Sequence, residues 1–161
     1  MKMKHALILL AFITFLYACS RPSFNLPSIM RTLYYSDKSE YDEFMDIKGF
    51  KWVQTDNTKF KTLTYFPIKE IKDSAAKDTI ERFYISTQAD TAKKIVYQTY
   101  NLKRYLKGIK DAKEAGFIDK KTSLGTSDFD ILEKDELLIL LNKSADYHGT
   151  KYQMIMTENP L

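Results

Sequence analysis

Few side chains in this sequence could do acid–base or nucleophilic chemistry. The 161 residues include one Cys and two His. Asp146 and His148 have the spacing of a general base and the carboxylate that orients it. Such a base needs a nucleophile, but Ser123, Ser127 and Ser144 lack the Gly-x-Ser-x-Gly pattern of a nucleophile elbow. We therefore interpret His148 as an exposed turn residue and expect the protein not to be an enzyme.

Metal and cofactor sites have equally little support. A single Cys excludes Cys-rich zinc sites, iron–sulfur clusters and a framework of internal disulfides. Asp128, Asp130 and Glu133 could offer oxygen ligands to Ca²⁺, but they lack the loop pattern of a calcium-binding hand. We interpret these carboxylates as part of a solvated loop, and we expect neither a metal nor a cofactor.

The N-terminus has the pattern of an export signal. A basic start over residues 1–5 precedes an apolar run over residues 6–18. The 13 residues of this run are fewer than the roughly 20 that a transmembrane helix needs, whereas a cleaved signal peptide is this short. The run leads into a tetrapeptide that resembles the lipobox of bacterial lipoproteins, with a bulkier residue than usual at its second position: Leu16-Tyr17-Ala18-Cys19.

The resemblance implies that residues 1–18 are removed and that the thiol of Cys19 carries lipid, including palmitate. The acyl chains would anchor the protein stably to a membrane. The absence of an acidic residue directly after Cys19 favours the outer membrane, with the protein facing the periplasm. We interpret residues 19–36 as the lipidated Cys and a tether. The alternative is an ordinary secretory leader in which Cys19 is incidental.

The remaining residues, 37–161, are expected to form one domain with two repeat units, 37–100 and 101–161. A hydrophobic fraction of 44% supports a packed core, and loss of Lys2 and Lys4 with the leader lowers the net charge from +4 to +2, which gives no reason to expect nucleic acid. Four pairs of neighbouring residues in the first unit recur in the same order in the second, which indicates duplication of one unit. The alternative is that these pairs agree by chance. The matching pairs are Gly49-Phe50 with Gly116-Phe117, Lys77-Asp78 with Lys134-Asp135, Ala89-Asp90 with Ala145-Asp146, and Tyr97-Gln98 with Tyr152-Gln153.

Each unit reads as a helix followed by three strands. The helices should end at Gly49 and Gly116, because Gly readily takes the left-handed conformation that ends a helix. The apolar run over residues 136–141 predicts a central strand covered on both faces. We expect an α+β fold, an antiparallel sheet with helices packed on one face. In outline this arrangement resembles the periplasmic inhibitor proteins that grip enzymes with a concave sheet.

Aromatic and basic residues offer the best candidates for partner binding. Tyr side chains suit interfaces because one end of the ring is apolar and the other is polar. A row of Lys on the polar face of the second helix could contact anionic lipid headgroups or an acidic partner. The candidate residues are Tyr65, Tyr84, Tyr97, Tyr152, Lys103, Lys107 and Lys110.

These patterns favour a non-catalytic lipoprotein of the cell envelope that binds a protein partner in an assembly or scaffold role. One alternative is an immunity or inhibitor lipoprotein that neutralises a toxin or enzyme in the periplasm. A lesser alternative is a hydrolase acting on cell wall or lipid, which would need a paired catalytic group that the sequence does not display.

Overall fold

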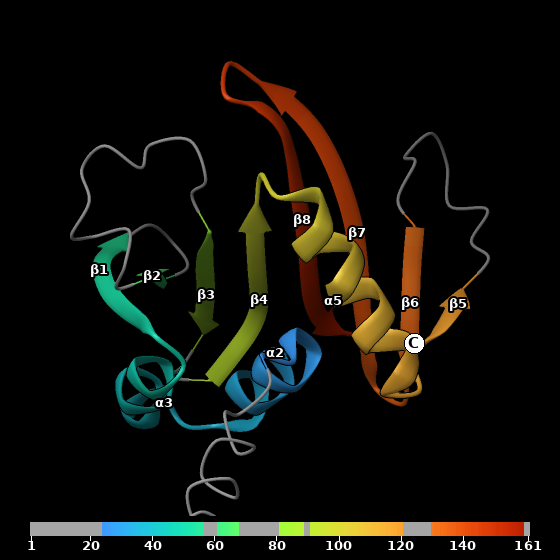
Figure 1. Cartoon of the computed structure of the whole chain (residues 1–161). Helices are drawn as coiled ribbons and strands as arrows, with labels where there is room; N and C mark the ends of the chain where they lie inside the picture. The colour runs from blue at the N-terminus through green and yellow to red at the C-terminus, as the bar shows by residue number, and fades with distance from the viewer. Residues whose placement is uncertain (1–23, 57–60, 68–80, 89–90, 121–129, 160–161) are drawn as a thin grey trace, which may run out of the picture.

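The computed structural model describes residues 24–56, 61–67, 81–88, 91–120 and 130–159. In these ranges the chain forms one antiparallel sheet of eight strands with three α-helices and a short 3₁₀ turn, η1 (Lys38–Glu40). The helices are α2 (Leu26–Tyr35), α3 (Tyr41–Ile47) and α5 (Leu102–Glu114). The strands are β1 (Phe50–Asp56), β2 (Lys61–Pro67), β3 (Arg82–Gln88), β4 (Thr91–Thr99), β5 (Ile118–Lys120), β6 (Asp130–Lys134), β7 (Leu137–Asp146) and β8 (Gly149–Glu158) (Figure 1). The expected α+β class with an antiparallel sheet is confirmed.

Helix α2 lies inside the stretch that we expected to be a tether. The Asn25 side chain accepts a hydrogen bond from the Ser28 N–H at 3.0 Å and so caps the helix. Pro27 sits in the first turn, where its missing N–H costs no hydrogen bond, so a residue that suggested a linker begins a helix instead. Leu26, Ile29, Met30 and Leu33 are at most 3% exposed. The folded domain therefore begins before residue 37, and the expected boundary was wrong.

The ends of α3 and α5 are as predicted. Gly49 and Gly116 have φ values of +83° and +92°, in the left-handed region that favours glycine. The Phe that follows each Gly, Phe50 or Phe117, is buried in the core. The same local device therefore turns the chain from each helix into the strand that follows.

Only some of the apolar residues of α5 are buried. Leu102 and Leu106 are 46% and 52% exposed, whereas Tyr105, Gly108 and Ala112 are buried. A Cβ atom on Gly108 would lie 2.7 Å from Met154 Sδ on β8 and 2.9 Å from Leu26 Cδ2 on α2. Close approach of the helix at Gly108 thus sets the rotation of α5 and leaves both leucines outside.

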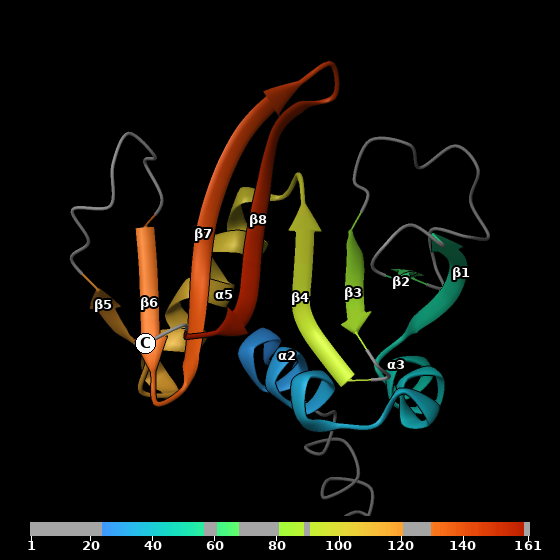
Figure 2. The ribbon, with the colours of Figure 1, turned by 180° about the vertical axis from the view of Figure 1, so that it is seen from behind.

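All three helices pack on one face of the sheet. Figure 1 shows α5 in front of β7 and β8, and Figure 2, seen from behind, shows these strands in front of α5. Every second residue of the strands joins the helices in a single core. The strand residues of this core are Phe50, Leu63, Tyr65, Phe83, Ile85, Ile95, Tyr97, Leu132, Leu137, Ile139, Leu141, Met154 and Met156.

The strand order is symmetrical about the centre of the sheet. It runs β1-β2-β3-β4-β8-β7-β6-β5, so each half of the chain contributes four consecutive strands and β4 pairs with β8. Four strands, rather than the three we expected, follow α3 and α5. The count differs because β1 and β2 are separate strands, as are the short β5 and β6.

Candidate functional site

Two of the four candidate tyrosines lie in the core. Tyr65 and Tyr97 are 1% and 0% exposed, on the sheet face that the helices cover. The Tyr65 hydroxyl donates to Asp42 Oδ1 on α3 at 2.7 Å. Burial raises the pKa of both hydroxyls above its usual range. These residues are therefore not available to a partner, and their choice as binding candidates was wrong.

The other two candidates lie on opposite faces. Tyr152 shares the helix-covered face and stacks on Tyr105 of α5, with ring centroids 4.9 Å apart. Tyr84 lies on the other face, where Arg82 Nη1 donates to its hydroxyl at 3.0 Å. In β3, Tyr84 alternates with the buried Phe83 and Ile85, which places it on the opposite face of the sheet. Of the four, Tyr84 is the one that a partner could reach on the face opposite the helices.

We call that face the open face, because no helix that the structure describes packs against it. One row across it is polar and internally hydrogen-bonded. Asn142 Nδ2 donates to Gln153 Oε1 at 3.0 Å, and Gln153 Nε2 donates to Gln98 Oε1 at 3.3 Å. The cross-strand register places Arg82 next to Gln98, at the end of this row. Arg82, Asn142 and Gln153 are partly exposed and present hydrogen-bonding groups along one side of the open face, whereas Gln98 is 6% exposed.

The neighbouring row on the open face is apolar. It crosses β3, β4, β8, β7 and β6 in that order, with one residue from each strand directly opposite the next. Thr64 of β2 is the Cα partner of its first member. Only Val96 is fully buried, at 7% exposed, and the others are partly exposed. We call this set the apolar row: Tyr84, Val96, Ile155, Leu140 and Ile131.

The sequence contained a signal for the apolar row that we interpreted differently. The run of apolar residues in β7 predicted a strand covered on both faces. Leu137, Ile139 and Leu141 do point into the core, but Leu138 and Leu140 point to the open face. Leu138 and Leu140 therefore belong to an apolar surface that no described element covers. A run of apolar residues in a strand looks the same in sequence whether its second face is such a surface or a second core.

The candidate lysines all lie exposed on α5. Lys107 pairs with Asp111 and Lys110 with Glu114, one helical turn on in each case. Lys103 precedes them on the same solvent-facing side of the helix. The prediction that Lys103, Lys107 and Lys110 share an exposed face is confirmed.

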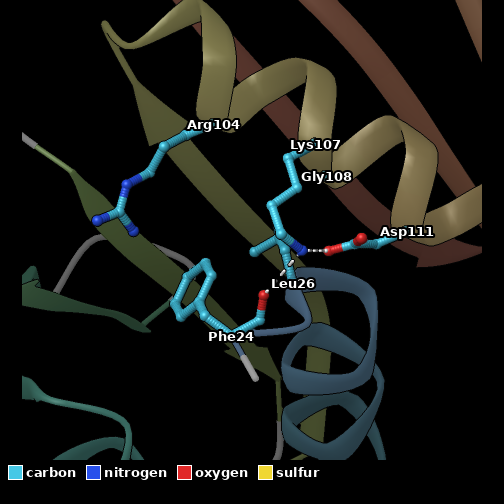
Figure 3. A pocket seen from close by; sticks show the side chains of 6 residues that line it. All are labelled: Phe24, Leu26, Arg104, Lys107, Gly108 and Asp111. Carbon is cyan, nitrogen blue, oxygen red and sulfur yellow. Dashed lines mark hydrogen bonds and ion pairs between the residues drawn. The ribbon is translucent and has the colours of Figure 1, made fainter. Parts of the chain in front are cut away.

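A cavity of about 310 Å³ lies between α5 and the beginning of α2. Phe24, Leu26 and Gly108 supply apolar walls, and Figure 3 shows Arg104 and Lys107 reaching from α5 toward Phe24. Arg104 lies 5.5 Å from the centroid of the Phe24 ring, and Lys107 Nζ donates to the Phe24 carbonyl oxygen at 3.4 Å. The cavity therefore combines an apolar lining with two cationic side chains, a feature that sequence reasoning missed because its two walls are 80 residues apart.

The candidate base lies in an exposed hairpin turn. The Asp146 carboxylate accepts from the Tyr100 hydroxyl at 2.7 Å and from the His148 backbone N–H at 2.9 Å. These hydrogen bonds hold the pKa of the Asp146 carboxyl below its usual range. Both carboxylate oxygens thus accept from groups other than the imidazole, so Asp146 acts as a structural acceptor in the turn.

Several candidates lie outside the described residues, namely Ser123, Ser127, Asp128 and Cys19, the expected site of lipidation. Asp130 and Glu133 are described, and Glu133 pairs with Lys120 at 2.7 Å. Within the ranges that the structure describes, no group of three or more His, Cys, Asp or Glu is arranged to hold a metal ion. The described part also contains no helix that is both long enough and apolar enough to cross a membrane.

Comparison of this chain with protein-family models, with curated proteins and with solved structures gave no match. Its function must therefore be inferred from the geometry of the open face and of α5.

Proposed function

We propose that this protein is a non-catalytic lipoprotein of the cell envelope that holds a protein partner on the open face of its sheet. The observation that carries the proposal is the apolar row. Five apolar side chains lie side by side across the sheet, and no helix that the structure describes covers them. A partner that covers this surface would remove it from water, which is energetically favourable.

The dimensions of the apolar row suit a protein rather than a small molecule. Neighbouring strands lie about 4.8 Å apart, so the row from β3 to β6 spans roughly 19 Å. The hydrogen-bonded amide row beside it would form a polar rim, and protein interfaces combine an apolar centre with such a rim.

The anchor follows from the lipobox-like tetrapeptide. The Cys19 thiol carries lipid, the protein faces the periplasm from the outer membrane, and the domain begins a few residues later. A membrane-held protein meets its partner at a raised local concentration, which favours an assembly or scaffold role.

Duplication of one unit is a further part of the proposal. Gln98 and Gln153, which the sequence matches at a separation of 55 residues, are Cα partners in the β4–β8 pair. Equivalent residues meet in this way where a two-fold axis passes through an antiparallel pair. The neighbouring pairs, Tyr97–Met154 and Thr99–Tyr152, follow from the same antiparallel register. The central Gln98–Gln153 pair thus supports two units each built from a helix and four strands.

Crosslinking in the native envelope, followed by affinity capture and mass spectrometry, tests the function. Ile155→Asp places a charge at the centre of the apolar row, and Tyr84→Ala removes its largest side chain with less effect on stability. We expect one dominant partner whose capture falls at least 10-fold in both variants. Tyr147→Ala, in an exposed turn, is the matched control and should capture the partner normally.

The identity of the captured protein separates the two roles. An envelope assembly component supports the scaffold role, whereas a toxin or enzyme supports the inhibitor alternative. Equal capture of the partner by the wild-type protein and all three variants would contradict binding through the open face.

A further inference from the structure

We propose that the first three turns of α5, together with Phe24, form a surface that rests on a membrane containing anionic phospholipid. The inference depends on the proposed lipid anchor at Cys19. It concerns the helix-covered side of the molecule, so the surface is separate from the open face.

The outward side of α5 has the composition of a helix at a membrane interface. Leu102 and Leu106 are about half exposed although both are apolar. Lys103, Lys107 and Lys110 lie on the same outward side. Helices that lie on membranes combine apolar side chains, which enter the interface, with Lys or Arg, which contact lipid phosphates. Leu102 and Leu106 lie one helical turn apart and form a short apolar strip, which a membrane interface would cover.

The position of Phe24 brings this side of the molecule to the bilayer. Five peptide units separate Cys19 from Phe24, and a fully extended chain spans at most about 3.6 Å per residue, or roughly 18 Å in total. Lys107 Nζ lies 3.4 Å from the Phe24 carbonyl oxygen. A lipid at Cys19 therefore holds the bilayer surface within reach of α5.

The local charge favours an anionic surface. Glu81 and Asp111, the carboxylates beside Arg104 and Lys107, have side chains only 10% exposed. The cationic partners are far more exposed, at 49% for Arg104 and 57% for Lys107. The outer layer around these two pairs is therefore cationic, and the phosphates of phosphatidylglycerol or cardiolipin complement it. At the end of the helix, Lys110 is offset by Glu114, which is 64% exposed.

The single Cys allows a direct test. The mature chain, residues 19–161, is coupled through the Cys19 thiol to a maleimide lipid in vesicles of phosphatidylcholine, with or without 30% phosphatidylglycerol. Chemical coupling supplies the anchor, so the result does not depend on lipidation in the cell. Labelling with palmitate, lost in Cys19→Ser, tests the anchor separately.

A tryptophan probe reports contact with the bilayer. Trp52→Phe removes the native indole, and Leu106→Trp then places one on α5. Tyr147→Trp is the control probe, because the β7–β8 turn lies at the end of the molecule opposite to α2 in both views (Figures 1 and 2). We expect brominated lipid to quench the Leu106→Trp probe at least threefold more than the control in vesicles with phosphatidylglycerol. This difference should shrink in high salt and in the Lys103→Glu, Lys107→Glu, Lys110→Glu variant.

Equal quenching of the two probes, or quenching of the α5 probe that is independent of phosphatidylglycerol, would overturn the proposal. Crosslinking of Lys107 in intact envelopes to an acidic protein, rather than to lipid, would also overturn it and would assign this surface to that protein.

Discussion

Glu81 precedes β3 and is 7% exposed, a rare position for an ionisable group. Arg104 Nε lies 2.7 Å from Glu81 Oε1 and connects α5 to the beginning of β3. Burial raises the pKa of the Glu81 carboxyl above its usual range, and the Arg104 charge opposes that rise. Burial of the Glu81 carboxylate is unfavourable by itself, and the ion pair with Arg104 offsets that unfavourable free energy.

Replacement of Arg104 with Met should lower the free energy of unfolding at neutral pH by about 1–3 kcal/mol, because it leaves a buried carboxylate without its cation. The pKa of Glu81 should rise further in this variant. A raised native pKa favours the protonated form, so the deficit should be largest at neutral pH and should shrink as pH falls through that pKa. Urea unfolding at pH 4 and pH 7 measures this difference. The double variant with Glu81→Gln should show a deficit that is nearly independent of pH.

Residues of this kind show what sequence patterns reveal and what they conceal. The exposed position of Lys103, Lys107 and Lys110 was predictable, since helical spacing alone separates them from the apolar residues. The burial of Tyr65 and Tyr97 was not, because it depends on which face of the sheet the helices cover. A tyrosine ring, with its polar hydroxyl, suits an interface and the edge of a core equally well. Which of the two it occupies depends on the pairing register of its strand, because the register sets the face to which the side chain points.

Helix α5 owes its position to its one glycine. The helix approaches β8 closely at Gly108, and Met154, the nearest neighbour of that position, is fully buried. The contribution of this close packing to stability can be measured, because a substitution at an exposed position of the same helix serves as a control.

Gly108→Val should lower the free energy of unfolding by about 2–3 kcal/mol, since its side chain would displace Met154 and Leu26 in a packed core. Lys110→Val introduces the same β-branched residue on the exposed side of α5, and it should cost only a few tenths of a kcal/mol from helix propensity. Thermal unfolding followed by circular dichroism compares the two. Similar stabilities for both variants would contradict the close packing of α5 on β8.

At the level of elements, local signals were reliable and long-range ones were not. Both helix ends followed from a Gly-Phe pair, which needs no information about the rest of the chain. Helix α2 escaped notice because Pro27, with Pro22 before it in the sequence, read as part of a linker. Its stability also comes from packing on β4 and α5 rather than from its own propensity.

The whole molecule depends on α2 as part of its core. Four α2 residues are at most 3% exposed, and burial of such side chains contributes about 1.5–3 kcal/mol each. A domain of this size has a total stability of roughly 5–15 kcal/mol, so loss of α2 would remove most of it.

A fragment of residues 37–161 should therefore lack a cooperative thermal transition, whereas residues 20–161 should unfold in one transition. Circular dichroism and dispersion of the amide signals in nuclear magnetic resonance distinguish the two outcomes. A well-folded 37–161 fragment would return the domain boundary to the position that the sequence indicated.

The strand order was beyond sequence reasoning, because pairing between β4 and β8 joins residues about 55 positions apart. With that order known, the two proposed surfaces occupy opposite sides of the sheet. A bilayer beneath α5 would leave the open face directed away from the membrane, where a periplasmic partner could approach without competition from lipid.

The pairing of Gln98 with Gln153 also has an evolutionary consequence. On the inferred duplication, an ancestral single unit would have ended in an unpaired edge strand corresponding to β4, and a second copy of the same chain would have been the natural mate for that edge. Gene fusion would then have made a concentration-dependent homodimer into one polypeptide. Each half would then have been free to diverge, and the second could have acquired the proposed membrane-facing residues of α5 without the first doing so.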